Sequence, residues 1–249
     1  MPTPQYLTPG TWLARHSLQP DERLFVVLGN ASAAKPFDAW RGLASGVLPQ
    51  PVWAGTAYAE WGEVMPYVGI IEPHSPFLDW IATTEATDWG WLAVSSSPLE
   101  QVIAQLNSLT KVLLPDGQAV FLRFWDGAHF LSVLQALAEE VGDVLPVFQR
   151  YLINGRLLAV APRPVGEAKT SPWWRVPPHV LEHLAEQSPQ TLSDNLLQWL
   201  EEQHPQLHAA FSPVTLKHKV VYFARNARGD QQALAAWLTS ETGVPLAAT

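Results

Sequence analysis

The pattern His179-Val180-Leu181-Glu182-His183 offers the most specific chemistry in this sequence. On a helix, His179 and His183 would lie one turn apart on the same side, where two imidazoles can bind Zn²⁺. Glu182 would lie beside them and could act as a general base, as in zinc peptidases with the H-x-x-E-H pattern. The pattern therefore suggests a metal-dependent hydrolase.

The surrounding residues argue against a metal site. The helix would begin directly after Pro177-Pro178, and its apolar side would leave both histidines and Glu182 in solvent. That apolar side consists of Val180, Leu181 and Leu184. No flanking residue is identified as a third ligand, although Glu241 is available. We therefore favour a solvated helix face and expect no metal and no other cofactor.

Further catalytic signatures are missing from the sequence. It has no cysteine, so disulfides, thiolate metal sites and cysteine nucleophiles are excluded. Neither G-x-S-x-G, a Walker-type loop nor G-x-G-x-x-G after a strand occurs. We expect a protein without catalytic residues that is not an enzyme.

Two aromatic–charged groups are candidates for contact with a protein partner. Arg123-Phe124-Trp125-Asp126 could contact a partner directly, or Arg123 and Asp126 could pair and fix a strand end to the next helix above Trp125. Trp173-Trp174 beside Arg175 also has the composition of an interface anchor. The alternative for Trp173 and Trp174 is that they hold two lobes together.

Composition limits the partners. The net charge is −8 and there is no basic run, so we expect no nucleic acid. The first residues lack the pattern of a signal peptide, and no apolar run approaches the ~20 residues that span a bilayer. We expect a cytoplasmic protein with no membrane partner. Charged residues make up only 15% of the sequence, and it contains 12 tryptophans. This composition favours exposed aromatic side chains that bind other proteins.

The elements that would position these residues fall into two groups. Residues 22–161 alternate strand-like and helix-like segments, with hairpin signals at Asp116-Gly117 and Asn154-Gly155. Prolines are dense over 162–178, and only helical patterns follow. The sequence predicts an α/β (α+β) fold with a mixed β-sheet flanked by helices, then a smaller all-helical lobe. The expected divisions are 1–161, a linker over 162–178, and 179–249.

The order of several blocks resembles a known family. Phe77-Leu78-Asp79-Trp80, the helix start Ser97-Pro98-Leu99-Glu100, Lys111-Val112 and Arg123–Asp126 are similar to the type VI secretion effector chaperones, or adaptors. Their domain is called domain of unknown function 4123, and the similarity covers roughly residues 22–150. In that family the first strand usually ends in an acidic residue, whereas here it ends in Gly29-Asn30.

The resemblance implies a non-enzymatic function. Such chaperones are thought to bind a cognate toxic effector in the producing bacterium and to assist its loading onto the VgrG spike. The expected partners are therefore an effector protein and a VgrG spike protein. A metal-dependent hydrolase using His179, Glu182 and His183, and a scaffolding protein without an effector, remain the alternatives.

The metal hypothesis can be tested directly. We expect the purified chain to contain no stoichiometric metal, because the histidine pattern lies on a solvated face without a defined third ligand. Elemental analysis checks this. About one zinc per chain, lost on changing His179 or His183, would contradict the expectation.

Overall fold

The chain forms two compact units. The computed structural model describes residues 6–43, 47–187, 189–227 and 230–242. The first unit is Met1–Pro177 and the second is Pro178–Thr249. The segment 162–178, predicted to be a linker, belongs to the first unit except for Pro178, which begins the second.

A six-stranded sheet is the centre of the first unit, with the order β2-β3-β1-β4-β7-β8. Every pairing in it is antiparallel. The central strand β1, for example, lies between β3 and β4 and runs opposite to both. The predicted α/β class, with a sheet flanked by helices, is confirmed, but the sheet is antiparallel rather than mixed in strand direction. The strands are β1 (Arg23–Gly29), β2 (Gln50–Pro51), β3 (Pro66–Ile70), β4 (Gly90–Ser95), β7 (Arg150–Ile153) and β8 (Arg156–Ala159).

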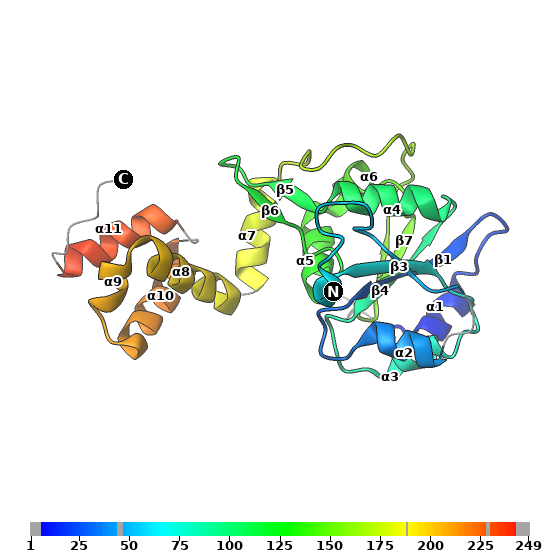
Figure 1. Ribbon diagram of the computed structural model, residues 1–249, viewed down its shortest axis with the longest axis horizontal. Coiled ribbons are helices and arrows are strands. Elements are labelled where there is room, and N and C mark those ends of the chain that lie inside the picture. Colours follow the sequence, from blue (N-terminus) through cyan, green and yellow to red (C-terminus); the bar gives the residue numbers. More distant parts are fainter. Residues whose placement is uncertain (1–5, 44–46, 188, 228–229, 243–249) are drawn as a thin grey trace. The chain divides into compact units, whose positions relative to one another are not determined.

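Helices cover both faces of this sheet (Figure 1). One face carries α1 (Pro9–Arg15), α2 (Pro36–Leu43) and α3 (Phe77–Thr83). On the other side lie α4 (Leu99–Ser108), α5 (Gly127–Leu137) and the short α6 (Val141–Val144). Two 3₁₀ turns, Gly62–Val64 and Ala138–Glu140, complete the helical elements of this unit.

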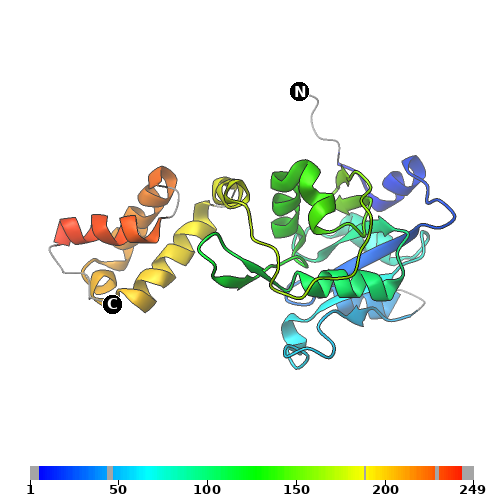
Figure 2. The ribbon, with the colours of Figure 1, turned by 90° about the horizontal axis from the view of Figure 1, so that it is seen from above.

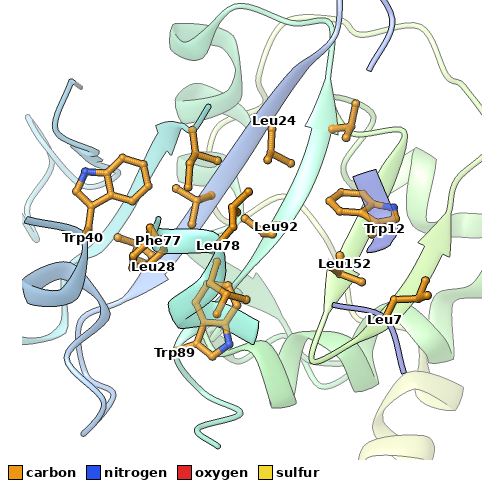
Figure 3. Packing of buried hydrophobic residues seen from close by; sticks show 14 residues of the cluster. Leu7, Trp12, Leu24, Leu28, Trp40, Phe77, Leu78, Trp89, Leu92 and Leu152 are labelled. Carbon is orange, nitrogen blue, oxygen red and sulfur yellow. The ribbon is translucent and has the colours of Figure 1, made fainter. Parts of the chain in front are cut away.

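The alternation of side chains along β1 creates a separate core on each face. Leu24, Val26 and Leu28 are buried among the residues of α1–α3. Figure 3 shows Leu24 and Leu28 in this core together with Trp12, Trp40, Phe77 and Leu92. Phe25 points the other way and meets Phe148 edge-to-face, with ring centroids 6.0 Å apart.

Trp91 of β4 ties the second face to α5. Its ring stacks on Phe130 of α5 at 5.1 Å, and its Nε1 donates to the backbone oxygen of Phe124 at 2.6 Å. Both partners are buried, so this hydrogen bond satisfies polar groups that would otherwise be costly to desolvate. The bond fixes the chain just before α5.

Two hairpins form at the predicted turns. The first joins β5 (Lys111–Leu113) to β6 (Ala119–Phe121) in a separate two-stranded sheet, and Figure 2 shows it as an arm extending from the first unit. Gly117 in its turn has φ 93°. The second joins β7 to β8, where Asn154 and Gly155 have φ 47° and 71°. Positive φ at both central positions is what an Asn-Gly turn provides.

The described part of the second unit contains helices alone, as predicted. They are α7 (Pro178–Gln187), α8 (Pro189–Gln203), α9 (Pro205–Ala209), α10 (Pro213–Ala227) and α11 (Gln231–Thr242). Their core includes Leu196, Leu200, Leu216, Val220, Leu234 and Leu238. None of the described helices in either unit combines the length and apolar character needed to cross a membrane.

Gly90 provides a test of the sheet geometry. Its φ is 138°, and a Cβ there would lie 1.9 Å from the backbone oxygen of Val27. We expect Gly90→Ala to lower the free energy of unfolding by at least about 1–3 kcal/mol from backbone strain alone. Urea denaturation measures this.

The matched control is Gly10→Ala, because Gly10 is an exposed residue of helix α1 and no atom lies within 4 Å of the added Cβ. It should be neutral or stabilising by up to about 1 kcal/mol. Equal unfolding free energies for both variants would contradict the strain at Gly90.

Candidate partner-binding surface

Five aromatic rings gather beside the β5–β6 hairpin and form what we call the aromatic surface: Trp53, Tyr58, Trp61, Phe121 and Trp125. The first three come from the loop between β2 and β3, and the others from β6 and the joint to α5. Tyr58 lies 5.2 Å from Trp61 and 5.0 Å from Phe121, and Trp53 lies 5.1 Å from Trp125. Segments about 60 residues apart in sequence thus form one cluster.

The cluster is layered from buried to exposed. Trp53 and Trp125 form its base, with 1% and 8% of their surface exposed. Tyr58 and Phe121 are half-buried above them. Trp61 is 46% exposed, which is high for so large an apolar side chain.

Polar contacts hold the base and the loop in place. Nε1 of buried Trp53 donates to Oγ1 of Thr110 at 3.0 Å. Asn30 Nδ2 donates to the backbone oxygen of Gly62 at 2.8 Å, directly after Trp61. Gly29 lies directly against Trp125, so closely that a Cβ on Gly29 would be only 3.0 Å from the backbone oxygen of Trp125. The Gly29-Asn30 end of β1 therefore supports the aromatic surface.

Cationic side chains border the rings. Lys111 Nζ lies 5.4 Å from the ring centroid of Tyr58 and 5.1 Å from that of Phe121, within cation–π range. The side chain of Arg123 is 60% exposed. The ammonium group of Lys111 beside these half-buried rings can attract an acidic segment while the rings supply apolar contact.

Asp126 connects Arg123 to α5. One carboxylate oxygen pairs with the Arg123 guanidinium, and the other accepts from the backbone N–H of His129 at 3.1 Å. Asp126 is thus the N-cap of α5. The predicted Arg–Asp pair, with Trp125 packed at the strand-to-helix joint, is present.

Trp174 and Arg175 lie on the opposite side of the hairpin. Leu113 N–H donates to the oxygen of Trp174, and Val176 N–H donates to the oxygen of Leu113, both at 2.8 Å. Trp174 is buried, with 8% exposed. Arg175 is exposed and donates to the backbone oxygens of Leu114 and Pro115. This segment extends the hairpin at β5.

Trp173 faces a different environment. Its Nε1 donates to Ser108 Oγ at 3.2 Å, and Lys169 Nζ lies 4.0 Å from the centre of its ring. It borders a cavity of about 320 Å³ that is also lined by Gln105 and Arg163. The structure therefore places the two sequence-predicted groups on opposite sides of one hairpin, and it does not join Trp173 to the aromatic surface.

The histidine pattern lies on α7. His179 and Glu182 are exposed, and His183 is half-buried. Within the residues that the structure describes, no group of three or more His, Cys, Asp or Glu side chains could hold a metal ion.

Sequence reasoning missed Trp53, Tyr58, Trp61 and Phe121. The available signal was three large aromatics within nine residues of a segment that lacks helical or strand periodicity. Aromatic residues in an aperiodic loop have no local core to fill, so they indicate a long-range cluster or a binding surface.

Residues 24–142 match a family described as domain of unknown function (DUF4123). This match runs from β1 to the first residues of α6 and includes the hairpin and the aromatic surface. No curated protein and no solved structure matches the chain.

His129 gives the site a measurable pH dependence. Burial, and then the nearby Arg123 guanidinium, lower its pKa below the usual 6.5, while Asp126 acts in the opposite direction. The unfolded chain therefore binds more protons than the folded chain just below pH 6.5. We expect the free energy of unfolding to fall as pH drops through this region, and His129→Gln to reduce that fall.

Urea denaturation at pH 7.5 and 5.5 measures the effect. His74→Gln, which removes an exposed imidazole from the same unit, is the control. An unchanged pH dependence in His129→Gln would contradict the expected effect.

Proposed function

We propose that this chain is a non-enzymatic chaperone or adaptor for a type VI secretion effector. It binds a cognate toxic effector in the producing bacterium and assists its loading onto the VgrG spike. The effector and the spike protein are its partners, and the chain acts in the cytoplasm.

The aromatic surface is the observation that carries this proposal. An interface that must later release its partner benefits from a few aromatic anchors in a polar rim rather than a wide apolar face. Trp61 and Tyr58 have this arrangement, with Lys111 beside the Tyr58 ring and the exposed Arg123 two positions before Trp125 in the sequence. The resemblance to effector chaperones and the domain match over residues 24–142 support the same proposal.

The hydrogen bonds that anchor the surface support it further. Trp53, Asn30 and Asp126 each hold one of its segments by a hydrogen bond. A preorganised surface loses less conformational entropy on binding. The exposed rings can therefore contribute affinity without prior rearrangement of the loop.

Co-expression with a candidate effector and a VgrG protein encoded beside the gene tests the proposal. We expect the wild-type chain to co-purify with the effector, and Trp61→Ala to bind about 10–30-fold more weakly, as for a hot-spot residue. Its thermal midpoint should change little, because Trp61 is 46% exposed. Affinity is measured by titration of purified proteins.

Trp80→Ala is the matched control. Trp80 is a half-buried tryptophan of α3, on the opposite face of the sheet, where it stacks on Phe77. It should retain effector binding. A wild-type chain that binds neither protein would overturn the proposed function, and equal affinities for Trp61→Ala and wild type would remove the aromatic surface from it.

A further inference from the structure

The basic residues of the second unit are concentrated in one short stretch of its sequence. Residues 178–249 contain seven acidic residues, Glu182, Glu186, Asp194, Glu201, Glu202, Asp230 and Glu241. Their four basic residues, Lys217, Lys219, Arg225 and Arg228, all fall within 12 consecutive positions. Helix α10 holds three of these four and no acidic residue. The unit is acidic overall, but α10 is cationic.

One side of α10 packs into the unit and thereby fixes which side faces solvent. Leu216, Val220 and Phe223 are buried in the core. Lys219 is also directed inward, since it pairs with Glu241 and its Nζ lies 5.3 Å from the ring centre of Trp237. The spacing of these residues leaves the opposite face of α10 to the solvent.

That opposite face is what we call the α10 stripe: Val214, Lys217, His218, Val221 and Tyr222. Val214 is 67% exposed. Tyr222 is 65% exposed and lies at the edge of the stripe, where its ring centre is 6.3 Å from that of Trp237. In the described part of this unit, these two are the exposed large hydrophobic side chains. Lys217 and His218 are exposed between them. The stripe thus combines apolar side chains with the ammonium group of Lys217 over about two helical turns.

We propose that the α10 stripe is a docking surface for an acidic amphipathic helix of another protein. Val214 and Tyr222 are eight residues apart, or about 12 Å along the axis, which matches apolar side chains two turns apart on a partner helix. Carboxylates flanking those side chains would lie near Lys217 and His218. This surface is separate from the aromatic surface and does not depend on the proposed function.

A second copy of this chain fits the stripe less well. The exposed acidic side chains of α8 include Asp194, Glu201 and Glu202, so a copy would supply negative charge. The exposed large hydrophobics of the described part of that unit lie on α10 itself, however, and among the described side chains of α8 none of the apolar ones is comparably exposed. The occupant must provide both, which favours a different protein.

Fluorescence anisotropy with a defined peptide tests the proposal on the full-length chain. The probe is a labelled helix of about six turns with leucines on one side and glutamates flanking them. A counterpart with lysines in place of glutamates reports on charge. We expect the acidic probe to bind and the basic probe to bind at least tenfold more weakly.

Substitutions in the α10 stripe test whether the acidic probe binds there. Val214→Ala combined with Tyr222→Ala should weaken the acidic probe at least tenfold, and Lys217→Glu should weaken it and reduce the salt dependence of binding. Tyr6→Ala removes a 61% exposed tyrosine from the first unit and should leave binding unchanged. Circular dichroism melting confirms that the variants are folded.

Three outcomes would overturn the proposal. These are no binding of the acidic probe, equal binding by the stripe variants, or displacement of the probe by phosphatidylglycerol vesicles or double-stranded DNA. Displacement would assign the stripe to an anionic lipid surface or to nucleic acid. The assay contains neither effector nor spike protein, so its failure leaves the proposed function standing.

Discussion

The close approach of backbone at the start of β4 is the constraint on which the first unit depends. A Cβ on Gly127 would lie 2.4 Å from the backbone oxygen of Gly90, so the first turn of α5 sits directly against the sheet. This contact brings Phe124 within reach of the Trp91 indole and places Asp126 at the start of α5. The rings beside the hairpin are thus positioned by the sheet itself, which explains how a surface built partly on loops can be ordered.

The hairpin connects the parts of the molecule that the sequence separates. On one side, β6 continues into Arg123, Trp125 and α5. On the other, Ser171 Oγ accepts from Lys111 N–H and donates to Lys111 O, and Leu113 pairs with Trp174 and Val176. Polar groups of β5 are therefore satisfied along both edges. This pairing makes the hairpin part of a larger structure, since an isolated two-stranded sheet has little stability of its own.

Local patterns predicted most of the fold, and long-range contacts account for what they missed. Asn154-Gly155 specifies its turn through its own backbone preferences, and β1 is recognisable as an apolar run. The proline-rich segment gave no local sign of its pairing with Leu113, because one N–H and one carbonyl are enough for that contact. Within the candidate site, Asp126 could be predicted from its place before a helix. The dense aromatic residues around Trp61 are visible in the sequence, but its ring contact could not be predicted, because the partner is Phe121, 60 residues later.

The geometry of the aromatic surface has an optical consequence. Trp53 and Trp125 meet nearly perpendicularly, at 88°, and Trp61 lies 6.4 Å from Trp53. Indoles this close and this asymmetrically arranged couple their electronic transitions, which gives a near-ultraviolet circular dichroism signal that depends on their mutual orientation. Excitation absorbed by a buried ring can also pass to Trp61 before emission. The chain thus carries an intrinsic chromophore at the surface itself, whose signal changes whenever these rings move or lose contact with water.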